Sequence, residues 1–166
     1  MVTVDQIRQL RELTGAGIME CKEALQKNDG DPDKAMAYLR EKGFAQAAKR
    51  ADRETSQGLI ESYIHTGGRV GALIELGCET DFVARTEDFQ ELAHEIAMQV
   101  AAMAPKYVSI DDKNPDDDNP DAQVVLLEQP YIKDSSKSIQ DLIQELAAKV
   151  GENIRVVRFS RLGLGE

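Results

Sequence analysis

Tryptophan is absent from this sequence of 166 residues, and aromatic residues make up only 5% of it. A protein that binds single-stranded nucleic acid by stacking bases on aromatic rings normally has more of them. Positive charge is also scarce, because 20 Lys and Arg stand against 30 Asp and Glu, which gives a formal net charge of −10. Contacts to phosphates need a basic surface, so this balance argues against direct nucleic-acid binding and against an anionic membrane as partner.

Long apolar runs are missing as well. None approaches the roughly 20 residues that a membrane-spanning helix needs, and the first residues, MVTVDQIRQLREL, lack the basic start and apolar centre of a signal peptide. The two cysteines, Cys21 and Cys78, lie in different segments and form no CxxC pair. We therefore expect two buried, reduced thiols in a cytoplasmic protein.

The residues that usually carry chemistry are few and scattered. Two histidines and two cysteines do not suggest a zinc site or a catalytic triad. The acidic residues 116–118 lack the glycine and the terminal glutamate of a calcium-binding loop, and no glycine-rich phosphate-binding loop is present. We expect no metal ion, no cofactor and no bound nucleotide, and we expect that the chain is not an enzyme.

Residues 1–43 predict a module of three short helices. Thr3 and Gln6 form a capping-box pattern at the start of the first helix, Pro32 suits the first turn of the third, and Gly43 is expected to end it. Several apolar residues recur at helical spacing and should face the interior of the module. They are Val4, Ile7, Leu10 and Leu13, then Ile18, Cys21, Ala24 and Leu25, and finally Ala35, Tyr38 and Leu39.

Residues 44–57, rich in alanine and basic residues, predict a linking helix between this module and a core domain at 58–166. The core should begin with a β-hairpin, because residues 59–65 and 70–78 are rich in β-branched residues and are separated by the turn sequence TGGR. In the second of these strands every other residue is apolar and should be buried.

The rest of the core predicts two helices and further strands. A long helix is expected between Thr86 and Pro105, and a capped helix over 139–150 is followed by a strand over 154–159. Residues 109–123 are acidic and contain prolines, which predicts a solvated loop, and residues 124–127 are a candidate strand. The fold class is therefore α+β: a three-helix N-terminal bundle, a linker helix, and a small antiparallel sheet covered by helices.

Asp81 and Phe82 lie on a short connection between the strand that ends at Cys78 and the helix that begins near Thr86. Phe82 could pack back onto the core while Asp81 caps the turn, which is the commoner fate of an aromatic ring. Alternatively, the ring could project from the surface and enter a pocket of a partner protein, as interface hot-spot residues do. The residues alone favour the first interpretation.

Two segments resemble the signature segments of the translation elongation factor Ts family. They are LRELTGAGIMECKEAL at residues 10–25 and CETDFVAR at residues 78–85, in the family's order and at about its spacing. The resemblance continues through GENI at residues 151–154 and covers nearly the whole chain except about 109–123. It implies an N-terminal bundle similar to ubiquitin-associated domains, an α+β core, and a function as guanine-nucleotide exchange factor for elongation factor Tu in protein biosynthesis.

The same resemblance implies where the partner is contacted. Phe82 would wedge between helices of the nucleotide-binding domain of elongation factor Tu, and Asp81 would act near its Mg²⁺ site. The segment that presses on this domain would comprise Thr80, Asp81, Phe82 and Val83. A second contact would be made by Arg11, Gly15, Ile18 and Met19. Since Ile18 and Met19 are adjacent, both cannot point inward on one helix, and we expect one of them to be exposed.

Other functions remain open at this stage. The chain could be a generic binding module whose N-terminal helices dock another protein, whereas a hydrolase is disfavoured because no paired carboxylates or triad can be assembled. Larger members of the family carry two core halves and a helical hairpin, but this sequence has one half. The sheet edge near residues 154–159 could then lie open, which makes a homodimer possible.

Overall fold

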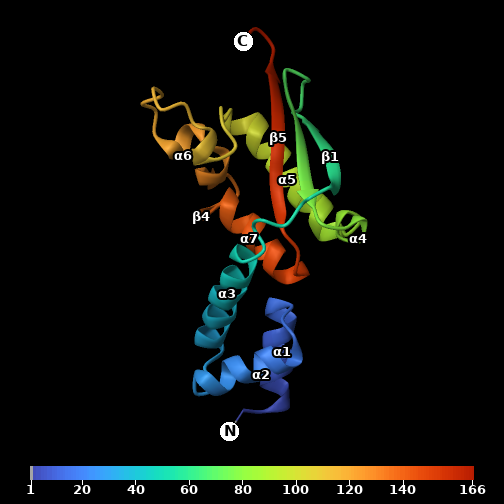
Figure 1. The fold of residues 1–166 in the computed structure, drawn as a ribbon, viewed down its shortest axis with the longest axis vertical. Coiled ribbons are helices and arrows are strands. Elements are labelled where there is room, and N and C mark those ends of the chain that lie inside the picture. Colours follow the sequence, from blue (N-terminus) through green and yellow to red (C-terminus); the bar gives the residue numbers. More distant parts are fainter. Residues whose placement is uncertain (1) are drawn as a thin grey trace.

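The computed structural model describes residues 2–166 and has two parts, a helical module at the N-terminal end and an α+β core (Figure 1). The two ends of the chain lie at opposite ends of the elongated molecule. Helices together with a small antiparallel sheet confirm the predicted fold class. No helix within residues 2–166 has both the length and the apolar character needed to cross a membrane.

The N-terminal module begins with α1 (Val4–Thr14) and α2 (Ile18–Lys27), followed by the start of α3. The predicted caps are present: Thr3 and Gln6 form a capping box, and the Asp31 carboxylate accepts hydrogen bonds from two backbone N–H groups of the first turn of α3. The interior is small, as expected for a module of this size. It consists of Leu10, Cys21, Ala24, Leu25, Ala35 and Leu39.

The third helix does not end at Gly43, so the separate linker helix at 44–57 is not formed as predicted. Instead α3 (Pro32–Ala48) is continuous, and residues 49–56 are turns and irregular chain. Gly43 faces α7 (Ile139–Val150), and a Cβ built on it would lie 2.9 Å from the Cβ of Ala148. This glycine therefore permits the close approach of two helices and does not terminate one.

The sheet of the core is antiparallel with the strand order β1-β2-β5. Its strands are β1 (Gln57–Ile64), β2 (Val70–Cys78) and β5 (Ile154–Gly163). The predicted hairpin is present, and the last strand continues beyond its expected end at Phe159. In β2, Ala72, Ile74 and Leu76 are buried, as the alternating pattern predicts.

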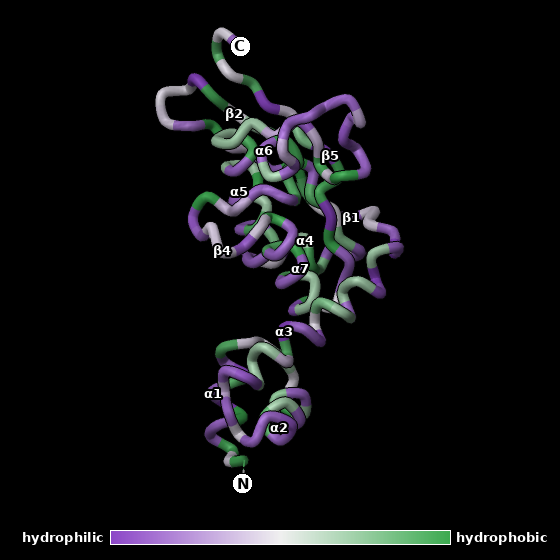
Figure 2. Tube along the Cα trace, turned by 90° about the vertical axis from the view of Figure 1, so that its left-hand side faces the viewer, coloured by the Kyte–Doolittle hydropathy of each residue, from purple (hydrophilic) through white to green (hydrophobic). Residues whose placement is uncertain are grey.

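Helices cover one face of this sheet. The short α4 (Asp81–Ala84) leads into α5 (Glu87–Met103), which packs on β1 and β2, and α7 packs on α5 and β5. Phe89, Ile96 and Ile139 are fully buried between these layers. Hydrophobic residues gather where the strands meet the helices, while the outer loops are hydrophilic (Figure 2).

The region between α5 and α7 was predicted in part. The acidic segment 109–123 is a solvated loop, as predicted, because none of its residues is buried. It also contains a 3₁₀ turn at Ile110–Asp112 and the start of α6 (Asp121–Val124), and two ion pairs hold it in place: Lys113 pairs with Asp121 at 2.7 Å, and Lys106 with Asp117 at 3.2 Å.

The strand expected at residues 124–127 is not formed. Val125 makes a single bridge with Tyr107, and a 3₁₀ turn at Leu126–Glu128 follows. A short apolar run cannot distinguish a strand from other buried chain. A small hairpin of β3 (Pro130–Tyr131) and β4 (Asp134–Ser138), which was not predicted, completes the core before Ser138 caps α7.

The contact between Gly43 and Ala148 generates a prediction about stability. Gly43→Ala should lower the free energy of unfolding by about 1 kcal/mol, because overpacking costs about 1–3 kcal/mol while the better helix propensity of alanine returns about 1 kcal/mol. Denaturant unfolding followed by circular dichroism measures the change. The double variant Gly43→Ala, Ala148→Gly moves the methyl group to the other helix and should restore near-native stability. If Gly43→Ala alone is as stable as the native chain, α3 and α7 do not need a glycine at their contact.

Candidate partner-binding site

The first part of the candidate site is the turn between β2 and α5. Thr80 caps α4 through its Oγ1, which accepts a hydrogen bond from the Val83 N–H at 3.4 Å. Val83 and Ala84 are buried and anchor this turn to the core. Phe82 points the other way, with 77% of its side chain exposed. The core-packing interpretation of Phe82 is therefore wrong, and the turn presents an apolar ring to solvent.

The charged residues of this turn are accessible as well. The Asp81 carboxylate lies 3.1 Å from the Arg85 guanidinium, one helical turn further on, and both side chains are largely in contact with solvent. An exposed pair of this kind contributes about 0–1 kcal/mol. Asp81 can therefore leave Arg85 for another cation at little cost.

Cys78, which precedes this turn, has no role of its own in the chemistry of the surface. Within residues 2–166 both cysteines are buried and neither forms a disulfide. Burial, followed by the charge of the nearby Glu152, raises the pKa of the Cys78 thiol, which donates to the backbone oxygen of Thr80. A thiol with a raised pKa stays protonated at neutral pH, so Cys78 behaves as a small hydrophobic residue.

The second part of the site is the corner between α1 and α2. Gly15 adopts a left-handed conformation with φ of 69°, and its N–H donates to the Arg11 oxygen at 2.8 Å, which ends α1. Ile18 and Met19 are 55% and 70% exposed. Exposure of one of them was expected, but the helical spacing that placed Ile18 in the interior is wrong. The buried face of α2 begins at Cys21, and the first turn of the helix extends beyond the small interior of the module.

Leu13 was missed by the sequence analysis. Helical spacing from Leu10 placed it in the interior, but it is 71% exposed beside the corner. A signal was present, because the Thr14-Gly15 break follows directly and leaves no further helical turn to cover this side chain. Leu13, Ile18 and Met19 are three exposed apolar side chains on either side of this corner, and we call them the corner patch.

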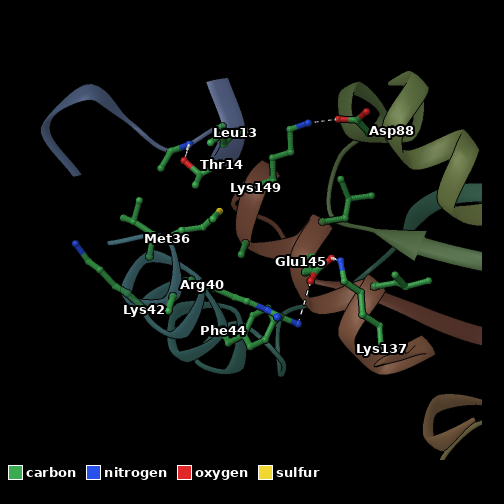
Figure 3. A pocket seen from close by; sticks show the side chains of 18 of the residues that line it. Leu13, Thr14, Met36, Arg40, Lys42, Phe44, Asp88, Lys137, Glu145 and Lys149 are labelled. Carbon is green, nitrogen blue, oxygen red and sulfur yellow. Dashed lines mark hydrogen bonds and ion pairs between the residues drawn. The ribbon is translucent and has the colours of Figure 1, made fainter. Parts of the chain in front are cut away.

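An open groove of about 1100 Å³ separates the module from the core. On the core side of the groove, Lys149 of α7 pairs with Asp88 in the first turn of α5 at 2.7 Å. Figure 3 shows this pair at the upper edge of the groove. The side chain of Lys149 also lies 3.4 Å from a Cβ built on Gly15. On the opposite side Arg40 of α3 pairs with Glu145 of α7 at 3.1 Å. The corner therefore rests against the part of the core from which α4 projects.

The predicted site residues thus lie on two surfaces, the turn of α4 on the core and the corner between α1 and α2 on the module. The turn of α4 lies at the end of the core that is nearer to the module (Figure 1). Thr80 and Val83 support the turn, whereas Asp81 and Phe82 are presented by it. Arg11 and Gly15 shape the corner, whereas Ile18 and Met19 are presented by it. Within residues 2–166 no three His, Cys, Asp or Glu side chains are grouped so that they could hold a metal ion.

Comparison with known proteins gives the family of the chain. The family model for elongation factor TS matches residues 26–116. Elongation factor Ts of Coprothermobacter proteolyticus is 47% identical over 195 aligned positions, which cover 99% of this chain and 99% of that protein. The chain belongs to the elongation factor Ts family. Elongation factor Ts of Thermotoga neapolitana is 46% identical, with 99% and 98% of the two chains covered, and that of Heliobacterium modesticaldum is 44% identical, with 100% and 91% covered.

This member of the family is shorter than the relatives that it matches. The alignment with the Coprothermobacter protein spans 195 positions, and this chain has 166 residues, so at least 29 positions have no counterpart here. As a member of this family the chain is an elongation factor of protein biosynthesis. Both surfaces described above are present despite the missing positions.

Proposed function

We propose that this chain is a guanine-nucleotide exchange factor that binds the nucleotide-binding domain of elongation factor Tu, disturbs its Mg²⁺ site, promotes GDP release and is then displaced by GTP. The observation that carries this proposal is the exposure of Phe82, 77% of whose side chain projects from a capped and anchored turn. An aromatic ring presented by a rigid turn is the kind of side chain that interface hot spots use.

Phe82 supplies the wedge in this proposal. Burying a side chain of this size is worth about 1.5–3 kcal/mol, which is available to displace groups of the partner. The turn is short and its neighbours Val83 and Ala84 are buried, so little conformational entropy is lost when the ring docks. The binding energy can therefore be used to deform the nucleotide pocket.

Asp81 supplies the electrostatic part. GDP is held mainly through its phosphates and Mg²⁺, and Mg²⁺ requires nearly ideal octahedral geometry. A carboxylate brought close to this site competes for the ion or for its ligands, and the exposed Arg85 leaves Asp81 free to do so. No covalent bond is made or broken, so we propose that the chain acts without being an enzyme and without a cofactor of its own.

The corner patch supplies a second contact with the same domain. Leu13, Ile18 and Met19 are exposed at the corner between α1 and α2, on the module and not on the core. Two contacts on one rigid body raise the effective concentration of each for its target. This arrangement holds the wedge in place for long enough to release GDP, and we place the reaction in the cytoplasm, together with translation.

Thermodynamic linkage explains how the cycle ends. If the factor weakens nucleotide binding, bound nucleotide weakens binding of the factor by the same free energy. Incoming GTP must therefore expel the factor from the partner. The proposal needs no energy source beyond the concentration of GTP.

We predict that substoichiometric amounts of this chain accelerate release of a fluorescent GDP analogue from elongation factor Tu. Phe82→Ala should reduce this acceleration about 10- to 100-fold, because truncating a hot-spot residue costs upwards of 1 kcal/mol and about 1.4 kcal/mol is tenfold. Ile110→Ala removes another exposed apolar side chain, far from the turn in sequence, and should leave the rate unchanged. If the native chain does not change the rate, the exchange function is wrong, and a binding module that acts through the corner patch takes its place.

We also propose that the chain forms a homodimer, through the outer face of its sheet. Both β1 and β5 are edge strands, but the pattern on the uncovered face is the stronger argument. The register places Ile64 and Leu162 on either side of Gly71, and Leu73 lies in the next row. All three large side chains are exposed, and they line a shallow apolar groove of about 450 Å³. An apolar sheet face is normally buried against another layer, but here the helices cover only the opposite face. A second copy of the chain offers a matching apolar surface.

Sedimentation equilibrium tests this dimer. The native chain should sediment with twice the mass of 18.4 kDa, and Leu73→Lys should shift it to the monomer, because each interface would then bury two lysines without partners. Ile110→Lys, a matched change at an exposed site outside the groove, should remain dimeric. A native chain that is monomeric at working concentrations would remove this proposal.

A further inference from the structure

The turn between α7 and β5 lies directly against the turn between β2 and α5 that carries Asp81 and Phe82, which we call the exchange turn. Gly151 ends α7 in a left-handed conformation with φ of 72°, and its N–H donates to Ala147. Three residues later Ile154 begins β5, opposite Cys78 at the end of β2. Glu152 and its neighbour Asn153 are thereby placed beside Glu79 and Thr80, which are more than 70 residues away in the sequence.

Glu152 accepts three hydrogen bonds from this neighbouring segment. Its Oε2 accepts from the backbone N–H groups of Glu79 and Thr80, each at 3.1 Å. Its Oε1 accepts from the Thr80 hydroxyl at 2.6 Å. Hydrogen bonds to an ionised carboxylate are about twice as strong as neutral ones, and these three are partly buried.

The contact is reciprocal and continues into the chain that precedes the sheet. The Asn153 N–H donates to the Glu79 carboxylate at 2.7 Å. The buried side-chain amide of Asn153 donates to the backbone oxygens of Ala51 and Arg53, at 3.0 and 2.8 Å. Glu79 also lies 3.5 Å from the Arg53 guanidinium. The segment before α4 is therefore fixed on both sides.

These contacts decide where Phe82 points. The Thr80 hydroxyl gives its proton to Glu152, so its lone pairs are turned toward the Val83 N–H at the start of α4. The two backbone N–H groups held by Glu152 set the direction in which the chain enters this one-turn helix. A helix of this length has too few internal hydrogen bonds to keep its own orientation.

We propose that Glu152 is a positioning residue for nucleotide exchange: it holds Thr80, and through Thr80 the turn that presents Asp81 and Phe82, without contacting the partner itself. This inference rests on the proposed function. A carboxylate suits this geometry best, because a glutamine would reverse the hydrogen bond with the Thr80 hydroxyl and would lose the strength that the negative charge gives to all three hydrogen bonds.

Glu152→Gln should therefore slow the accelerated release of GDP about tenfold. Glu128→Gln, the same change at an exposed site outside this contact, should leave the rate unchanged. In a Phe82→Ala background, Glu152→Gln should have little further effect, because the ring that it positions is gone. Full additivity of the two changes, or an unchanged rate for Glu152→Gln alone, would overturn the proposal.

Hydrogen exchange on the free chain provides a readout that does not depend on the partner. Glu152→Gln should speed exchange of the Glu79 and Thr80 amides at least several-fold while the amides of β2 stay protected. Unchanged exchange at these two positions would overturn the positioning role. If the native chain fails to release GDP, the proposed function is what fails, and this measurement still decides whether Glu152 holds the turn.

Thr80→Val provides a second test in case Glu152→Gln does not fold. It removes the hydrogen bond that the Thr80 hydroxyl donates to Glu152 and the one that it accepts from the Val83 N–H, and it keeps the shape of the side chain. We expect a several-fold slowing of GDP release, with a circular dichroism spectrum like that of the native chain. A native rate in this variant would contradict a role for the contact between Thr80 and Glu152.

Discussion

The pairing of β2 with β5 is the interaction on which the rest of the molecule depends. β2 is the central strand, and its buried residues form the floor on which α5 packs. Because the exchange turn begins where β2 ends, its position is fixed by the most buried part of the core. Because β5 begins opposite that point, it brings the carboxylate of Glu152 from a distant part of the sequence to the base of the same turn. A rigid sheet, a short turn and a supporting carboxylate are the usual means of presenting a side chain precisely from a protein surface.

The second constraint is the seam between the module and the core. α3 is a single helix that belongs to both parts, since its first half lines the interior of the module and Gly43 and Ala47 in its second half approach or join the core. The ion pair of Arg40 with Glu145 joins α3 to α7 across the groove, whereas that of Lys149 with Asp88 joins two helices of the core beside it. The spacing between the corner patch and Phe82 is therefore set by packed helices and not by a flexible linker. If the chain touches one partner domain at two places, as we propose, such spacing limits the entropy lost on binding.

Much of the fold could be predicted because the signals are local. The capping boxes at Thr3 and Ser138, the turn between β1 and β2, and the alternation along β2 each depend on residues close in sequence. The errors arose where tertiary contacts decide. Gly43 is a residue type that often ends a helix, but here it faces Ala148 on a neighbouring helix. Residues 124–127 are apolar because they are buried and not because they form a strand.

The candidate site divides in the same way. The segment around Asp81 and Phe82 was found through its motif, but only the structure shows that the ring is exposed. Ile18 and Leu13 are exposed because the interior of the module is small. Helical spacing shows which residues share a face but not how far the interior extends along that face. Glu152 could not be connected to Thr80 from the sequence, because their contact spans 72 residues and depends on the register of β5.

The central claim is that this chain and the nucleotide oppose each other on elongation factor Tu. Calorimetric titration of the native chain into the nucleotide-free and the GDP-bound forms of that protein tests it most directly. The account predicts much tighter binding to the nucleotide-free form, with a difference in free energy equal to the loss of GDP affinity that the factor causes. Equal affinities for the two forms would contradict it.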